Sequence, residues 1–328
     1  MSMIIRRTPM RVWVAALCVW MSVTACSPSA PPDGDAEDSA SKPTVALIMK
    51  SLANEFFKTM EEGAKKHSEA NADSYTLIVQ GIKNELDIDQ QIQLIEQMIA
   101  RNVDAIVIAP ADSKAIVPVC KRAIEAGIVV INIDNKFDEA VLKERDVKIP
   151  FVGPNNREGA RKVGEFLAKS LQSGDPVAIV EGAPNAFNAT QRRLGFEDAI
   201  NEAGLTLVTA QTANWEMDQA NQVVSAIATE HPEVKAYLCA NDNMALGAVA
   251  ALKAANKLEA VRVVGFDNIS AVQDLVKQGQ ILATADQHAD QLAVFGIEHA
   301  LAVLRSGEAL DDRETPVDLI TAESLPAQ

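Results

Sequence analysis

Polar and aromatic side chains of a few chemical types recur along the chain in the segments that follow short apolar runs. They are carboxylates, amides, one arginine and aromatic rings. A hydroxyl group both donates and accepts hydrogen bonds, so planar carboxylate, amide and guanidinium groups can bind polyols through paired contacts. Aromatic faces can pack against the C–H faces of a sugar ring. The candidate ligand-binding residues are Asn54, Phe56, Phe57, Asp134, Asn135, Asn188, Arg192, Trp215, Asn241, Asp267 and Gln287.

Several of these residues also fit a structural role. Asp134, Asn241 and Asp267 each follow an apolar run, where such side chains commonly cap the next helix. The two adjacent phenylalanines fit a hydrophobic core as well as a binding site. Arg192 lies in a segment rich in charge and also fits a solvated helix face. The shared placement of the whole set after apolar runs favours binding over these separate explanations.

The segments around the candidates alternate between two hydrophobic periods. Short, unbroken apolar runs predict strands, and longer segments with apolar residues at helical spacing predict helices. Strands are predicted at 44–49, 75–79, 105–108, 129–133, 151–153, 177–180, 205–210, 236–240, 261–266 and 283–285. Helices are predicted at 54–70, 87–101, 113–126, 157–171, 190–203, 217–230, 243–254, 269–278 and 290–305.

This alternation predicts βαβ units and parallel sheets. Strands without polar alternation are expected where helices cover both faces of a sheet. Roughly ten strands are too many for one compact sheet of this kind, and 328 residues suffice for two domains. We therefore predict an α/β fold with two doubly wound parallel-sheet lobes. Ligands of such sheets bind at the carboxyl ends of the strands, where the candidates lie.

Residues 1–25 have the composition of a secretory signal peptide. Three arginines precede a nearly apolar run over residues 12–23, which is too short to span a bilayer comfortably. A small residue, Ala25, comes directly before Cys26. Residues 26–43 are rich in proline and acid and lack apolar periodicity, so they predict a flexible, solvated linker.

The overall charge of the chain excludes some partners. The formal net charge is −15, and removing the three arginines of the leader makes it three units more negative. Nucleic acid binding needs clustered lysines and arginines, and attraction to an anionic membrane surface needs a basic patch. We therefore expect no nucleic acid partner, and a membrane association that depends on an anchor.

Reactive or cofactor-binding motifs are absent from the sequence. It has no phosphate-binding glycine-rich loop and no dinucleotide-binding or hydrolase nucleophile motif. The four histidines lack metal-ligand spacing, and His288 is expected to be structural. Cys120 and Cys239 lie in apolar runs and are predicted to be buried free thiols in different lobes. We expect no cofactor and no metal.

Three segments give the sequence a family resemblance. They are Asn-Glu-Phe-Phe at 54–57, Asn-Asp-Asn-Met-Ala-Leu-Gly at 241–247 and Val-Val-Gly-Phe-Asp at 263–267. From residue 44 onward the chain resembles the ribose/galactose-type periplasmic sugar-binding proteins, the substrate-binding subunits of ABC sugar importers. LacI-type repressors share this fold but begin with a helix-turn-helix. Here a signal peptide and Cys26 occupy that place.

The resemblance implies the architecture of a type I periplasmic binding protein. Its two lobes are joined by a three-stranded hinge and close over the ligand. The N-terminal lobe would comprise 44–154 plus 288–316, and the C-terminal lobe 155–287 plus 317–328. The segment Val23-Thr24-Ala25-Cys26 also resembles a bacterial lipobox, which implies a lipid on Cys26. An uncleaved anchor helix, or cleavage without lipidation, is the alternative.

The resemblance assigns the candidate residues to ligand binding but leaves the ligand open. Ribose receptors have Asp-Arg where this chain has Asp134-Asn135, and usually phenylalanine where it has Trp215. Glucose/galactose receptors have an acid at the position of Asn188. Loss of the arginine removes a rigid fork of donors. A hexopyranose, a cyclitol and a pentitol all remain open.

The expected function is capture of a sugar or polyol outside the cytoplasm and its delivery to an ABC permease. The protein would be a monomer, located in the periplasm or on the cell surface and held to the membrane through Cys26. The alternative is a sugar- or autoinducer-sensing receptor that feeds a chemoreceptor or sensor kinase. A glycosidase would need Asp134 and Asp267 as a catalytic pair. We expect these carboxylates only to accept hydrogen bonds, so no enzymatic activity is predicted.

Overall fold

The computed structural model describes residues 42–326, which belong to one compact unit. The predictions for the leader, for Cys26 and for nearly all of the linker fall on residues outside this range. Within it, no helix combines the length and apolar character needed to cross a membrane.

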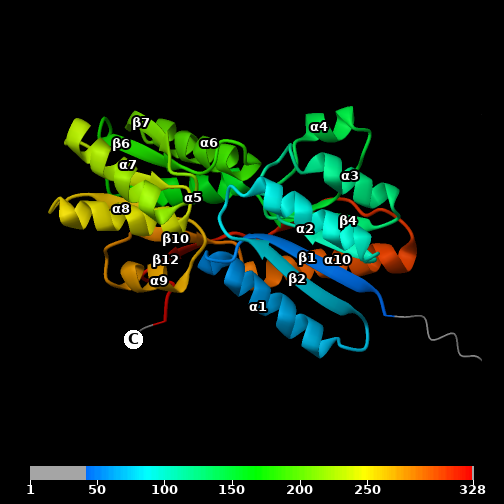
Figure 1. The fold of residues 1–328 in the computed structure, drawn as a ribbon. Coiled ribbons are helices and arrows are strands. Elements are labelled where there is room, and N and C mark those ends of the chain that lie inside the picture. The colour runs from blue at the N-terminus through cyan, green and yellow to red at the C-terminus, as the bar shows by residue number, and fades with distance from the viewer. Residues whose placement is uncertain (1–41, 327–328) are drawn as a thin grey trace, which may run out of the picture. The chain divides into compact units, whose positions relative to one another are not determined.

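Two six-stranded sheets form the framework of the described chain (Figure 1). The first sheet contains, in spatial order, β11 (Arg313–Thr315), β5 (Phe151–Pro154), β4 (Val129–Ile133), β3 (Ala105–Ile108), β1 (Thr44–Ser51) and β2 (Thr76–Ile82). The second contains β12 (Asp318–Thr321), β10 (Ala283–Asp286), β9 (Arg262–Val264), β8 (Ala236–Cys239), β6 (Pro176–Glu181) and β7 (Thr206–Thr212). All neighbours are parallel except β10 and β12.

Helices cover both sheets and define two lobes. In the first lobe, α1 (Glu55–Ala70) packs with α10 (Ala289–Ser306), and α2 (Ile88–Ala100) packs with α3 (Val117–Glu125). The short helix α4 (Glu139–Glu144) follows β4. In the second lobe, α5 (Asn156–Ala168) packs with α6 (Phe187–Glu202), α7 (Met217–Glu230) with α8 (Asp242–Ala254), and α8 with α9 (Ser270–Lys277).

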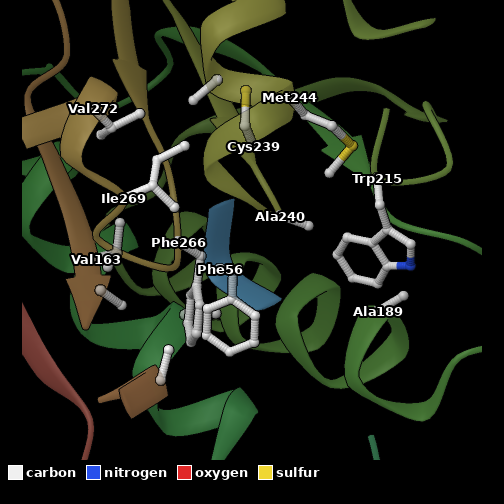
Figure 2. Packing of buried hydrophobic residues seen from close by; sticks show 14 of the residues in the cluster. Phe56, Val163, Ala189, Trp215, Cys239, Ala240, Met244, Phe266, Ile269 and Val272 are labelled. Atoms are coloured by element: carbon white, nitrogen blue, oxygen red, sulfur yellow. The ribbon is translucent and has the colours of Figure 1, made fainter. Parts of the chain in front are cut away.

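The central strands are fully buried, as the unbroken apolar runs predicted. All four residues of β3 and all four of β8 are buried, which requires cover on both faces. The larger hydrophobic cluster continues from one lobe into the other. Figure 2 shows Phe56, from α1 of the first lobe, in this cluster with residues of the second lobe such as Trp215 and Phe266.

Three connections join the lobes. They run from β5 to α5, from β10 to α10 and from β11 to β12. The predicted class, an α/β fold with two sheets that are predominantly parallel, is confirmed. The residues at which one lobe gives way to the other stay a prediction.

Some element boundaries differ from the predictions for local reasons. The helix expected from 113 begins at Val117, because Oδ1 of Asp112 accepts the N–H groups of Lys114 and Ala115 and holds a turn there. Helix α6 begins at Phe187 rather than 190, which places Asn188 in its first turn. The strand expected over 261–266 is shorter, and the elements β11, β12 and α4 were not predicted.

Candidate functional site

A cavity of about 240 Å³ lies between the lobes, beyond the carboxyl ends of several strands. Its wall is made of polar, charged and aromatic side chains from both lobes. The lining residues are Lys50, Asn54, Phe56, Phe57, Glu85, Asp134, Asn188, Arg192, Trp215, Asn241, Asp267 and Gln287. Ten of the eleven candidates from the sequence are in this set.

The start of α1 supplies one side of the wall. Asn54 is the N-cap of α1, and its Oδ1 accepts the N–H of Phe56 at 3.0 Å. Its Nδ2 donates to Oε1 of Glu85 at 3.3 Å. The cap uses only the amide oxygen of Asn54, so the amide nitrogen can orient Glu85, a second cavity residue. The rings of Phe56 and Phe57 meet edge to face, with centroids 5.1 Å apart.

Lys50 is the central cation of the first lobe. It lies in β1, and its side chain is only 4% exposed. Its Nζ is 3.2 Å from Oδ2 of Asp134 and 3.9 Å from Oε2 of Glu85. It also lies 5.6 Å from the ring centroid of Phe57 and 5.7 Å from that of Trp215. Carboxylates and ring faces therefore offset the cost of burying this ammonium group.

Arg192 is the corresponding cation of the second lobe. It lies in α6, and its Nε donates to Oδ1 of Asn156 at 2.8 Å. Its Nη1 donates to the carbonyl of Ala240 at 2.8 Å and is 3.5 Å from Oδ1 of Asp267. The guanidinium carbon is 3.8 Å from the ring centroid of Phe266. The side chain is fixed and buried, so the interpretation of Arg192 as a solvated residue is wrong.

Asp267 and Gln287 form a pair next to Arg192. Nε2 of Gln287 donates to Oδ1 of Asp267 at 2.6 Å. The backbone of Asp267 has φ 128°, a conformation that side-chain-bearing residues rarely adopt. Its N–H donates to the carbonyl of Ala285 at 2.7 Å, so pairing with the end of β10 stabilises this conformation.

Three buried acceptors of the cavity wall have no hydrogen-bond donor within residues 42–326. They are Oδ2 of Asp134, Oδ1 of Asn188 and Oε1 of Gln287. The ammonium group of Lys50 lies near the first of these, at 3.2 Å, but not in hydrogen-bonding geometry. Buried polar atoms are nearly always paired, so acceptors of this kind point to donors on a ligand.

Burial shifts the protonation of the carboxyl groups. It raises the pKa of Glu85 to about 7, against the opposing effects of Lys50 and of the hydrogen bond from Asn54. It also raises the pKa of Asp267 well above its usual range, against the opposing charge of Arg192. Asp242 lies behind the wall and accepts from the hydroxyl of Thr284 at 2.7 Å; burial raises its pKa to about 7.

The structure places Asn135 outside the cavity lining, although the sequence suggested a ligand contact. Asn135 is fully buried, and its Nδ2 donates to the carbonyl of Pro110 at 2.9 Å. Its Oδ1 accepts from the hydroxyl of Ser113 at 3.3 Å and from the backbone N–H of Asn188 at 3.1 Å. The last bond crosses from one lobe to the other. All of its polar side-chain atoms are engaged within the protein.

Asp134, Asn241 and Asp267 could each have been a helix cap, but only Asn241 is one. Oδ1 of Asn241 caps α8, while its Nδ2 donates to the carbonyl of Trp215. Asp134 and Asp267 cap no helix, because the N-caps of α4 and α9 are Asp138 and Ile269.

The other sequence predictions for reactive residues can be compared directly. Cys120 in α3 and Cys239 in β8 are free and buried in different lobes, as predicted. His288 is the N-cap of α10, and its Nε2 is 2.9 Å from Oδ2 of Asp318, a contact between two of the lobe connections.

Lys50 and Glu85 are lining residues that sequence analysis missed. The strand expected over 44–49 continues to Ser51, so Lys50 lies at the carboxyl end of this strand. Ligands of parallel sheets bind at such ends, and this strand-end rule could therefore have identified Lys50. The strand expected over 75–79 continues to Ile82, which brings Glu85 to its carboxyl end.

Comparison with known proteins gives consistent matches over nearly the whole described chain. The model of the periplasmic binding protein domain matches residues 45–309. A D-ribose/D-allose-binding protein of Pseudomonas aeruginosa is 51% identical over 316 residues, covering 95% of this chain and 99% of the relative.

Solved structures agree with these sequence matches. A solute-binding protein of an ABC transporter from Burkholderia multivorans is 55% identical with a TM-score of 0.85, covering 86% of this chain and 100% of that one. A periplasmic solute-binding protein from Actinobacillus succinogenes with bound D-allose is 36% identical with a TM-score of 0.82, covering 86% and 99%.

Proposed function

This chain belongs to the periplasmic binding protein family, and from that premise we propose that it captures a neutral monosaccharide or similar polyol between its lobes for delivery to an ABC import permease. The observation that carries the proposal is the cavity wall. It combines buried acceptors that lack donors, two fixed cations and aromatic rings. Each ligand hydroxyl can donate to one group and accept from another.

The size of the cavity supports a small ligand. The empty space enclosed by the wall, together with its opening to solvent, is about 240 Å³, which favours a single sugar ring over an oligosaccharide. Phe56, Phe57 and Trp215 supply faces for the C–H groups of such a ring.

The charges around the cavity support a neutral ligand. Two cations, Lys50 and Arg192, face three carboxyl groups, Glu85, Asp134 and Asp267. Each cation already lies next to a carboxyl group of the wall, because Lys50 Nζ is 3.2 Å from Oδ2 of Asp134 and Arg192 Nη1 is 3.5 Å from Oδ1 of Asp267. A further anion would be buried without its own counterion, which is costly. Sugar acids and sugar phosphates are therefore expected to bind poorly.

The relatives suggest which sugars to test first. The Pseudomonas aeruginosa relative is named for D-ribose and D-allose, and the Actinobacillus succinogenes structure contains D-allose. D-Ribose and D-allose are thus the leading candidates for this chain. Cyclitols come next, because the sequence departs from the ribose-receptor pattern at Asn135.

We also propose that the leader is removed, that a lipid on Cys26 anchors the protein outside the cytoplasm, and that the protein works as a monomer without catalysis. The support for the anchor is the Val-Thr-Ala-Cys segment at 23–26. Metabolic labelling with a fatty acid should label the wild type and not Cys26→Ser. Label that survives this substitution would contradict the anchor.

Isothermal titration tests the proposed ligand class. D-Ribose, D-allose and myo-inositol should include at least one ligand that binds, and D-ribonate should bind far more weakly than D-ribose. Asp267→Ala removes the acceptor of Gln287 Nε2 and leaves Arg192 without its neighbouring carboxyl group, so the affinity should fall roughly tenfold or more. The matched control is Asp73→Ala, an exposed carboxylate of the first lobe. Tighter binding of D-ribonate than of D-ribose would contradict a neutral ligand.

A further inference from the structure

Two loops meet across the lobes beside the cavity. One contains Asp112 and Ser113 and is joined by Asn135; the other contains Asn185 and leads into α6. Four hydrogen bonds connect them: Ser113 N–H to the carbonyl of Asn185 at 3.1 Å, Nδ2 of Asn185 to Oδ2 of Asp112 at 2.9 Å, Phe187 N–H to Oγ of Ser113 at 2.9 Å, and Asn188 N–H to Oδ1 of Asn135 at 3.1 Å.

The first-lobe half of this contact is held rigidly. Nδ2 of Asn135 donates to the carbonyl of Pro110. The backbone carbonyl of Asn135 accepts a hydrogen bond from Nδ2 of Asn132 at 2.8 Å. Oγ of Ser113 donates to Oδ1 of Asn135 while accepting from the second lobe. The acceptors that face the second lobe therefore have fixed positions, which lowers the entropy lost when the lobes meet.

Asn188 connects this contact to the cavity. Its backbone N–H donates across the lobes to Asn135, while its side chain lines the cavity with an Oδ1 that lacks a donor among the described residues. A ligand that engages this side chain would hold the start of α6 where its N–H groups reach the first lobe.

We propose that Asp112, Ser113, Asn135 and Asn185 form a cross-lobe latch that sets the fraction of closed protein without touching the ligand. Asn135, for which the sequence suggested a ligand contact, then binds the other lobe instead. A fifth cross-lobe bond, from Ser270 N–H to Oε1 of Glu55 at 2.8 Å, is exposed to solvent and lies outside the latch. The inference rests on the proposed function only for its ligand-binding readout.

A latch and a ligand contact have different signatures. If only the closed form binds tightly, the apparent dissociation constant is the intrinsic one divided by the closed fraction. Loss of a latch bond lowers that fraction and weakens every ligand by the same factor. Loss of a cavity contact weakens ligands unequally, since each ligand uses that contact differently. One hydrogen bond corresponds to roughly a twofold to tenfold change.

The experiment compares Asn185→Ala and Asn135→Ala with the wild type, using isothermal titration with D-ribose, D-allose and myo-inositol. Each variant should raise the dissociation constants of all bound sugars by one common factor of roughly two to ten. Gln191→Ala is the matched control. Gln191 lines a surface groove together with Asp112, Ser113 and Asn185, and its side chain makes no hydrogen bond to residues 42–326. Trp215→Phe should give unequal factors.

Small-angle X-ray scattering of the ligand-free proteins gives a second readout. Asn185→Ala should have a larger radius of gyration than the wild type. Asn185 is half-buried, so this variant keeps the test valid if the fully buried Asn135→Ala fails to fold. Unchanged affinities in Asn185→Ala, or factors that differ between sugars, would overturn the latch. If no sugar binds the wild type, the proposed function fails, while the scattering comparison still tests the latch.

Discussion

Among the cavity residues, Lys50 is the one whose substitution should lower the affinity for the sugar most directly. Its ammonium group is buried between Asp134 and Glu85 and close to two aromatic rings. Lys50→Met keeps most of the side-chain volume but removes every donor. We expect affinity for the sugar to fall roughly tenfold or more, since hydrogen bonds to charged groups contribute about 1.5–3 kcal/mol each. Isothermal titration measures the change.

The control for this substitution is Lys148→Met, an exposed lysine of the first lobe that pairs with Asp311. Exposed pairs contribute little, so its affinity and stability should match those of the wild type. Equal affinities for Lys50→Met and Lys148→Met would remove Lys50 from the binding site.

Glu85 should make the stability of the ligand-free protein depend on pH. Its pKa is about 7 in the folded protein and about 4.5 ordinarily, so the folded state holds the proton more tightly between these values. This contribution is complete below about pH 4.5 and is lost as the pH rises through about 7. The glutamine introduced by Glu85→Gln cannot ionise, so this variant does not lose the contribution that the wild type loses as the pH rises. The unfolding free energy of the variant relative to the wild type should therefore rise by up to about 3 kcal/mol between pH 5 and pH 8.

Urea unfolding at the two pH values measures this difference. Other buried carboxyl groups such as Asp242 remain in both proteins, so their effects cancel in the comparison. Glu69→Gln, an exposed change on α1, should follow the wild type at both pH values. A constant difference between Glu85→Gln and wild type would show that Glu85 keeps an ordinary pKa.

The strand-end rule predicted most of the cavity wall from the sequence, and its failures have physical causes. Lys50 and Glu85 were missed because pairing between β1 and β2 extends both strands beyond their apolar runs. Asn135 was assigned to the ligand because its position follows the same rule as that of Asp134. Which of two adjacent polar residues faces a cavity depends on partners distant in the sequence, here Pro110 and Asn188.

At the scale of elements, the end of β6 lies against Trp215. A Cβ atom added to Gly182 would overlap the six-membered part of the indole ring. Gly182→Ala should therefore displace Trp215, weaken sugar binding and shift the emission of this tryptophan. Fluorescence titration measures both effects. Trp13 and Trp20 lie in the predicted leader, so Trp215 is the only tryptophan of a chain that begins at Cys26.

Trp215→Phe separates displacement from loss of the ring. With the smaller ring, Gly182→Ala should cost less than it does beside the indole, and the two substitutions should not be additive. Additive losses in the double variant would show that the alanine acts elsewhere than on Trp215.

Element boundaries were predictable where the hydrophobic period changes sharply. The predicted bounds of β3, β4 and α7 agree with the structure. The short strands β11 and β12 lack apolar runs of their own, and they exist through pairing with β5 and β10. Such pairing joins segments that are distant in the sequence, so no local sequence pattern predicts these two strands.

At the scale of the whole molecule, the larger hydrophobic cluster makes the lobes interdependent. It includes Val45 and Leu47 of β1 as well as Val177 and Ile179 of β6, so it has members in both sheets. Phe56 and Trp215 belong to it beside the cavity. Because the cluster is shared, unfolding of one lobe would expose apolar surface of the other lobe. This exposure favours cooperative unfolding of the two lobes.

We therefore expect a single unfolding transition in urea when sugar is present. Trp215 emission reports the second lobe and far-ultraviolet circular dichroism reports both, so the two midpoints should coincide. Sugar at about 100 times its dissociation constant should raise the unfolding free energy by roughly 2.7 kcal/mol for both signals. Two separated midpoints, with the sugar shifting only one, would mean that the lobes unfold independently and that the cluster does not couple them.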